Sequence, residues 1–268
     1  MKKIFTILTA ALLALFSTSC FEQTAVIRLN KDGSGTITET TLLGAEASAM
    51  LEGMSAQGGG EDPLSKMTDE KLTSAYAKKL GEGVEVEKAG KVEKGGKKGV
   101  EVVYKFKDIN KVSFAMGGSM VEASKAMAPE GAEVKTPDQK PVTFKYADGV
   151  LTLANPQNKP AKPEGAAGDA KPEIDPAQLE MAKGMFKDMR MSFKVEMADG
   201  IAETNATHRD GNTVTLIDIE FAKLVEDPDK LKKMMELNDE GPAAAAALFK
   251  DTPGVKFESK EELTVKVK

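Results

Sequence analysis

Residues 24–42 read TAVIRLNKDGSGTITETTL, and this stretch decides the fold. Two runs rich in β-branched residues, 24–29 and 36–42, flank the turn-forming tetrapeptide DGSG at 32–35. β-Branched residues favour extended backbone, and an Asp-Gly pair supplies the positive φ that a tight hairpin needs. The stretch therefore predicts two antiparallel strands joined by a short turn.

The same signature recurs farther along the chain. Asp-Gly pairs begin at positions 148, 199 and 210, and each stands between short runs of β-branched and aromatic residues. Each pair predicts a tight turn between two neighbouring strands. In 100–107 and 263–267 apolar residues alternate with polar ones, which is typical of strands with one covered face and one solvated face.

Helices are predicted between these hairpins, over 44–57, 68–80 and 176–190, from apolar residues at three- and four-residue spacing. The fold class that follows is α+β, with antiparallel sheets built from hairpins and covered on one face by helices. The element order of 68–112 recurs in 176–225, which indicates an internal duplication. Two unrelated sheets patterned alike would give the same order, so that alternative stays open.

Residues 155–176 interrupt this pattern with five prolines among Lys, Ala, Gly and Glu, and with almost nothing apolar. Such a segment cannot offset the entropy lost on ordering, so it is predicted to be a flexible linker. The predicted organisation is a signal segment over 1–19, an N-terminal α+β half over 20–154, the linker, and a C-terminal α+β half over 177–268.

Residues 1–19 have the composition of a secretory signal. Two lysines precede an apolar run over 4–16, and small residues at 17–19 lead to Cys20, the one cysteine of the chain. The apolar run is too short for a stable membrane span. With no second cysteine, no disulfide framework is expected.

The position of Cys20 directly after the small residues resembles a bacterial lipobox, with Ser17 where the usual pattern has Leu. The resemblance implies cleavage before Cys20, diacylglycerol on its sulfur and acylation of the new amino group. Two or more acyl chains give durable anchoring, so the protein is expected on a membrane surface without a spanning helix. The alternative is an ordinary, unprocessed cysteine at the end of a signal peptide.

The charged residues bear on what the protein can bind. The chain has 37 Lys and Arg against 42 Asp and Glu, a net charge of −5, so it lacks the basic surface of a nucleic-acid binder.

The expected location is the cell envelope, on a membrane surface facing the periplasm. Phe21 replaces the Asp that marks inner-membrane retention in enterobacteria, which by analogy favours the outer membrane.

Residues 30–37, NKDGSGTI, match the first eight positions of an EF-hand calcium loop in their oxygen donors and glycine. Position 12 of that loop is Thr41, which lacks the bidentate carboxylate, and position 1 is Asn30 rather than Asp. The flanks are also predicted strands rather than helices. The sequence therefore favours a β-hairpin turn, and no metal or cofactor is predicted.

Catalytic patterns are sparse. His208 is the one histidine, which excludes a multi-histidine zinc site, and its place at a hairpin tip favours an exposed turn residue over a general base. A hydrolase of envelope polymers that uses a pair of Asp or Glu side chains is the enzymatic alternative.

The methionines provide a second clue to function. Met181, Met185 and Met189 form a continuous helical stripe, which is interpreted as a core face packed on a sheet, with a lipid- or partner-binding face as the alternative. A second Met-rich segment, 113–127, contains a Gly-Gly pair that weakens a core helix, so it is the preferred candidate for ligand binding.

Three stretches carry a family resemblance: the lipobox at 17–20, NKDGSGTI at 30–37 and MRMSFKVE at 189–196. Together they resemble uncharacterised bacterial lipoproteins of verrucomicrobial and planctomycete type and, more distantly, the LppM-type lipoprotein domain. The likeness spans most of 1–225 and implies an anchored extracytoplasmic α+β domain without catalytic residues.

The predicted function is thus a cell-envelope lipoprotein, tethered to the membrane through the lipid on Cys20, whose non-catalytic domain binds an apolar ligand or a protein partner. The alternatives are the hydrolase and a purely structural or assembly role. A cleft with convergent carboxylates would favour the hydrolase, an apolar groove would favour binding, and the assembly role predicts no pocket.

Overall fold

A computed structural model of the chain describes residues 21–58, 62–127, 140–155, 180, 183–184, 186, 188–227, 229–230, 247–249 and 252–268. The predicted signal segment 1–19, Cys20 and residues 156–176 of the predicted linker lie outside these residues, as do Met181 and Met185. Asn155, the first residue of the predicted linker, is buried, and its N–H donates to the carbonyl oxygen of Glu261 at 2.7 Å.

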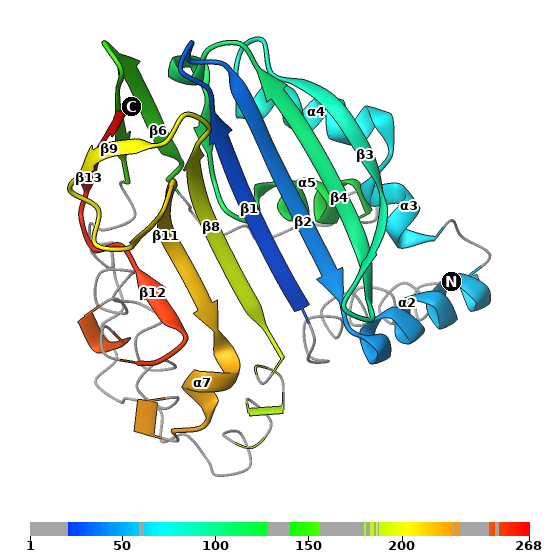
Figure 1. Cartoon of the computed structure of the whole chain (residues 1–268). Coiled ribbons are helices and arrows are strands. Elements are labelled where there is room, and N and C mark those ends of the chain that lie inside the picture. Colours follow the sequence, from blue (N-terminus) through cyan, green and yellow to red (C-terminus); the bar gives the residue numbers. More distant parts are fainter. Residues whose placement is uncertain are drawn as a thin grey trace, which may run out of the picture.

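The larger sheet has eight strands in the order β10-β11-β8-β1-β2-β4-β3, with β12 paired to β11 (Figure 1). The strands are β1 (Phe21–Leu29), β2 (Gly35–Leu43), β3 (Glu85–Lys94), β4 (Lys97–Phe106), β8 (Arg190–Met197), β10 (Arg209–Asp210), β11 (Thr213–Glu220) and β12 (Val255–Phe257). All neighbours run antiparallel except β1 and β8, which run parallel.

The smaller sheet has five strands in the order β5-β6-β7-β13-β9. They are β5 (Ser113–Phe114), β6 (Val142–Ala147), β7 (Val150–Ala154), β9 (Ile201–Thr204) and β13 (Glu262–Val267). Both sheets therefore take strands from the predicted N-terminal half and from the predicted C-terminal half. One hydrophobic cluster joins the two sheets.

The helices are α2 (Ala45–Gly58), α3 (Pro63–Met67), α4 (Glu70–Leu80), α5 (Gly118–Met127) and α7 (Phe221–Val225), with a 3₁₀ turn η1 (Ile109–Lys111). Asp69 begins α4, because its carboxylate accepts hydrogen bonds from the N–H groups of Lys71 and Leu72 at 2.9 and 3.1 Å. The helices predicted over 44–57 and 68–80 are confirmed as α2 and α4. Among the described residues no helix has the length and apolarity needed to cross a bilayer.

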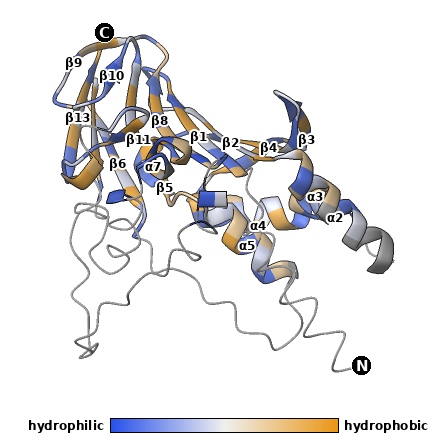
Figure 2. Ribbon diagram, turned by 90° about the horizontal axis from the view of Figure 1, so that it is seen from below, coloured by the Kyte–Doolittle hydropathy of each residue, from blue (hydrophilic) through white to orange (hydrophobic). Residues whose placement is uncertain are grey.

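The core lies on one face of the larger sheet. Along β1 every second residue from Gln23 to Leu29 is buried, and the residues between them face outward. The smaller sheet covers this face over β8 and β1, whereas α4 and α5 cover it over β2 and β4 (Figure 2). The predicted α+β class, with helices on one face of a largely antiparallel sheet, is confirmed.

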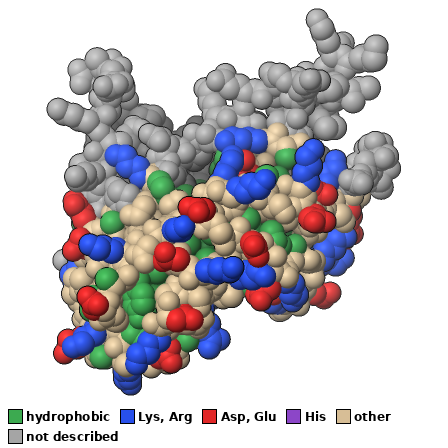
Figure 3. All heavy atoms as spheres, turned by 90° about the horizontal axis from the view of Figure 1, so that it is seen from above, with side chains coloured by type: hydrophobic (Ala, Val, Ile, Leu, Met, Phe, Trp, Pro, Cys, Tyr) green, Lys and Arg blue, Asp and Glu red, His purple; other side chains and the backbone are tan. Residues whose placement is uncertain are grey.

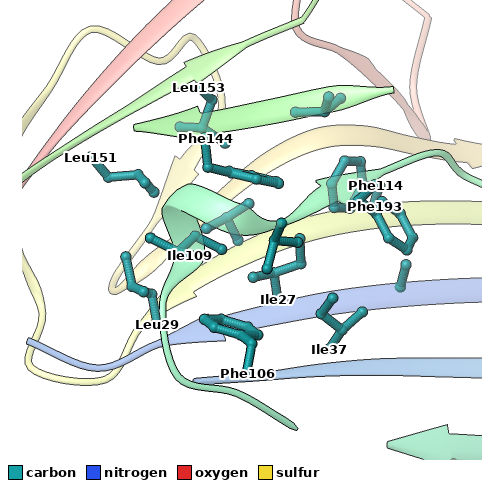
Figure 4. Packing of buried hydrophobic residues seen from close by; sticks show 14 of the residues in the cluster. Ile27, Leu29, Ile37, Phe106, Ile109, Phe114, Phe144, Leu151, Leu153 and Phe193 are labelled. Carbon is teal, nitrogen blue, oxygen red and sulfur yellow. The ribbon is translucent and has the colours of Figure 1, made fainter. Parts of the chain in front are cut away.

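Aromatic and branched aliphatic side chains fill the space between the two sheets (Figure 4). Ile27 and Phe106 of the larger sheet point toward Phe144 of the smaller one, and the Phe114 and Phe193 rings lie 4.8 Å apart. At the other end of the buried face, Tyr76 of α4 meets Tyr104 of β4 edge to face, with ring centroids 5.8 Å apart.

Three of the four Asp-Gly pairs form the predicted hairpin turns, between β1 and β2, β6 and β7, and β10 and β11. The pair at 199 does not. Gly200 has the expected positive φ of 95°, but β8 lies in the larger sheet and β9 in the smaller one. The Asp-Gly residues determine the backbone conformation of the turn, whereas packing in the core determines which strands pair. Because of this crossover, segments 68–112 and 176–225 differ in strand pairing.

Gly99 of β4 allows the sheet to close against β2. A Cβ atom at this position would lie 1.9 Å from the carbonyl oxygen of Thr41, whereas a Cβ at Gly90 of β3 would meet nothing within 4 Å. We expect Gly99→Ala to lower the free energy of unfolding by at least about 2 kcal/mol and Gly90→Ala to change it by less than about 0.5 kcal/mol. Urea denaturation measures both, and equal effects would contradict the close backbone contact.

Candidate functional site

A carboxyl group lies in the core of the larger sheet. Glu39 of β2 shares the buried face with Ile37 and Thr41, because alternate residues of a strand point the same way. Only 4% of Glu39 is exposed to solvent. The sequence analysis did not single out this carboxyl group, although its spacing from Ile37 is the signal that identifies it.

Three polar side chains from three elements meet residues 117–119, at and just before the start of α5. Ser119 donates from its hydroxyl to Oε1 of Glu39 at 3.2 Å. Gly118 lies against Tyr76 of α4, and Gly117 lies against Gln23 of β1, whose side-chain oxygen is 3.6 Å from the position that a Cβ would take. Residues 117–119 therefore form the contact between α5 and a buried polar cluster of Glu39, Gln23 and Tyr76.

This cluster is short of hydrogen bonds. Four buried side-chain polar atoms have no hydrogen bond of good geometry in the described part of the chain, and three of them are Glu39 Oε2, Gln23 Nε2 and Tyr76 Oη. The backbone of Ser119 still acts on the Tyr76 hydroxyl and lowers its pKa. Gln23 and Tyr76 are only 3% and 6% exposed. Because a buried polar group without a partner costs about 1–3 kcal/mol, the gathering of such groups under residues 117–119 makes this region the candidate site.

The glycines at the start of α5 make this arrangement possible. Gly117 has a φ of 81°, a conformation that side chains other than glycine rarely adopt. A Cβ at Gly118 would stand 2.6 Å from the Tyr76 hydroxyl, so any larger residue would displace the ring. The Gly-Gly pair in the segment 113–127 thus begins a helix and admits polar groups beneath it.

A small cavity lies beside the polar cluster. It has a volume of about 20 Å³, and Glu39, Tyr76 and Ser119 line its polar side. Thr41, Thr73 and Tyr104 also line it, and Val100, Val102, Met67, Leu72 and Ala123 form its apolar walls. This volume admits one group the size of a water molecule. We call this cavity, together with the polar cluster, the Glu39 pocket.

Burial controls the protonation of the pocket. It raises the pKa of Glu39 to about 8, and the hydrogen bond from Ser119 opposes that shift. Burial, with the Glu39 charge as the next cause, also raises the pKa values of Tyr76 and Tyr104 well above the ordinary tyrosine value. Near neutral pH the pocket is therefore largely uncharged, with Glu39 as an acid able to donate a hydrogen bond.

The calcium-like stretch is a hairpin turn, as predicted. The N–H and hydroxyl of Ser34 donate to Asp32 Oδ1 at 2.9 and 2.6 Å, and Asn30 donates to the Ser34 hydroxyl at 3.1 Å. Thr41, at position 12 of the loop pattern, lies far along β2 and lines the Glu39 pocket. Within the described residues, no three His, Cys, Asp or Glu side chains come close enough to hold a metal ion.

His208 is half-buried, so the prediction of an exposed turn residue is wrong. Its Nε2 lies 3.1 Å from the carbonyl oxygen of Phe257, which places the ring against β12. Glu258, which follows Phe257 in the chain, is buried and accepts hydrogen bonds from the N–H and hydroxyl of Thr207 at 2.6 and 2.9 Å. Both side chains attach the segment after β12 to the loop before β10.

The predicted methionine sites are distributed differently. Met116 belongs to the hydrophobic core, and Met120 of α5 is half-buried. Of the stripe 181–189, only Met189 is described, and it is half-buried. In segment 113–127 it is Ser119 and Ala123, rather than the methionines, that line the Glu39 pocket.

An open groove of about 560 Å³ lies between α4 and the edge strand β3. Ala77, Val84 and Val86 contribute its apolar surface, and charged residues of both signs surround them. The strand is irregular at Glu87, where the register with β4 shifts, and it carries Lys88, Lys91 and Lys94. Lysines and bulges protect sheet edges from pairing with other chains, so this groove is poorly suited to accept a partner strand.

Comparison with known proteins gives one distant likeness. No family model matches the chain, and no curated protein matches it. Among solved structures, the chain is similar to the folded domain of the Mycobacterium tuberculosis LppM protein, determined by NMR. The two share 9% sequence identity over 74% of this chain and 81% of that chain, with a TM-score of 0.30. At this level the likeness carries no functional inference.

The buried carboxyl predicts a pH-dependent stability. Because the folded-state pKa of Glu39 lies above its unfolded value, the stability that protonation contributes is complete below pH 4.5 and is lost as pH rises through 8. Between pH 4.5 and 8.5 the wild type should lose roughly 3–5 kcal/mol relative to Glu39→Gln, as measured by urea unfolding.

Glu101 provides the matched control for this experiment. Its hydrogen bond with Lys94 lowers its pKa, so its contribution to stability is lost as pH falls rather than as it rises. Replacement by Gln should therefore change the pH profile in the opposite sense. If wild type and Glu39→Gln showed parallel profiles, the carboxyl would not titrate as a buried group.

Proposed function

We propose that the protein is a cell-envelope lipoprotein, held at a membrane surface by lipid on Cys20, whose body binds an apolar ligand in the Glu39 pocket. One observation carries the binding role: Glu39 and Tyr76, two buried side chains with polar atoms that lack a hydrogen bond of good geometry, line a small cavity together with Val100, Val102, Met67, Leu72 and Ala123. The lipid attachment is supported by the resemblance of residues 17–20 to a lipobox.

The donors of the pocket suggest the chemistry of the ligand. With Glu39 protonated, its carboxyl group and the Tyr76 hydroxyl can both donate a hydrogen bond into the cavity. A carbonyl oxygen of an acyl ester or amide accepts such bonds without bringing a charge into the core. The cavity has room for one such group, so the acyl chain would leave it past Met67, a flexible side chain suited to varied apolar partners.

The number of acidic residues that line the pocket favours a binding role over hydrolysis. Glycosidases with two catalytic carboxyl groups hold them about 5–10 Å apart across the substrate. Glu39 is the one acidic residue among those that line the pocket. A purely structural protein gains nothing from buried polar atoms that lack hydrogen bonds of good geometry, since their cost weakens the fold.

The anchor is tested by Cys20→Ser. We expect this variant to leave the membrane fraction or to accumulate as an uncleaved precursor, because the sulfur that carries the lipid is lost. Fractionation and intact-mass measurement of both forms check the result. A variant that matures and sediments with membranes like the wild type would contradict the lipoprotein proposal.

The ligand is tested by filling the pocket. Ala123→Leu adds bulk to the pocket wall, whereas Ala126→Leu makes the same change on the exposed side of α5. After incubation with phospholipid vesicles, purified wild type and Ala126→Leu should retain an acyl-ester lipid in native mass spectrometry, and Ala123→Leu should lose at least about nine-tenths of it.

Circular dichroism would verify that Ala123→Leu remains folded; if it does not, Glu39→Leu serves as the second pocket variant. Retention of lipid by a folded pocket variant would move the binding site elsewhere. The absence of retained lipid in every form would favour the assembly role.

A further inference from the structure

The attachment point and the folded body are adjacent in the chain. Strand β1 begins at Phe21, the residue after Cys20, and Phe21 is already paired with Leu43 of β2. Consecutive Cα atoms are about 3.8 Å apart, so a lipid on Cys20 would be joined to a central strand of the larger sheet without a spacer. This inference rests on the lipid attachment proposed above.

Strand registers show which segments share that end of the sheet. Leu43 of β2 faces both Phe21 of β1 and Lys98 of β4. Glu22 faces Arg190 at the start of β8, and Arg190 faces Glu220 at the end of β11. The turn between β3 and β4, the start of α2 and the start of α7 therefore lie at one level, at the lower end of the sheet in Figure 1.

This end carries incompletely buried apolar side chains. Phe21 and Leu43 are half-buried and lie side by side in the sheet. Phe186 and Phe221, also half-buried, stack with ring centroids 5.7 Å apart, and the N–H of Phe221 donates to the carbonyl oxygen of Met189 just before β8. Burial of such residues against acyl chains is favourable, because it removes apolar surface from water.

The charge distribution does not favour membrane contact at the opposite end of the sheet, where the turn at Asp32 lies. Hydrogen bonds from Lys31 to Asp199 and from Tyr146 to Lys31 show that the turns after β1, β6 and β8 gather there. Figure 3 shows basic and acidic side chains interspersed on this face, seen from above. The covalent attachment and the apolar residues at the Phe21 end therefore decide which end meets the bilayer.

We propose that the Phe21 end of the larger sheet rests on the bilayer and that the turn at Asp32 faces away from it. Strand β1 has nine residues, so the two ends are separated by about 30 Å. The bilayer is thus a second partner of the body, which contacts it through Phe21, Leu43 and the stacked rings of Phe186 and Phe221.

The test uses the single cysteine of the chain. Once Cys20 carries lipid, a cysteine introduced at an exposed lysine is the one reactive thiol. Lys98→Cys places a fluorophore at the Phe21 end, and Lys31→Cys makes the same exchange at the far end. Each lipidated full-length variant is reconstituted into vesicles of phosphatidylcholine and phosphatidylglycerol that contain a headgroup-linked energy acceptor.

Energy transfer to the acceptor should be at least about threefold greater from position 98 than from position 31, because the two ends differ in height by about 30 Å. An eight-residue Gly-Ser spacer inserted after Cys20 should reduce this ratio toward one, because the body is then free to turn. Equal transfer without the spacer, or greater transfer from position 31, would overturn the orientation.

Intact-mass measurement separates this result from the proposed function. A protein with diacylglycerol on Cys20 and equal transfer at both positions would contradict the orientation alone. A protein without lipid that stays out of the vesicle fraction would contradict the anchoring and, with it, the orientation that depends on it.

Discussion

The structure depends on the position of β1 between two partners. This strand pairs antiparallel with β2 and parallel with β8, so it joins the segments that the sequence divides into two halves. Its alternate residues from Gln23 to Leu29 lie in the core that both sheets and two helices share. Because each side of β1 is occupied, a change in its register would move Ile27 and its neighbours out of the core.

The polar cluster sets a limit on how well this core can be packed. Most of the buried face is apolar, but the Gln23–Glu39 region retains donors and acceptors that the described chain does not satisfy. The two glycines at 117 and 118 bring α5 close enough to enclose them. A core selected for stability alone would replace these groups with apolar side chains, which is often neutral or favourable. In the function proposed above, these groups serve a ligand.

Local structure was largely predictable from the sequence, whereas strand partners were not. The Asp-Gly turns at 32, 148 and 210, the helix over 68–80 and the α+β class follow from short-range patterns. The crossover at Asp199-Gly200 could not be predicted, because the same turn serves a hairpin or a change of sheet. The inward direction of Glu39 was readable from its spacing to Ile37. The contact between α5 and Glu39 could not be predicted, because the tertiary fold brings α5 over that side chain.

The parallel pairing of β1 with β8 also determines when the fold can be completed. Strand β1 emerges early in synthesis, but its partner begins only at Arg190. Contacts between residues distant in sequence form slowly, because the entropy of closing a long loop opposes them. Until β8 arrives, one edge of β1 remains open to pairing with other chains.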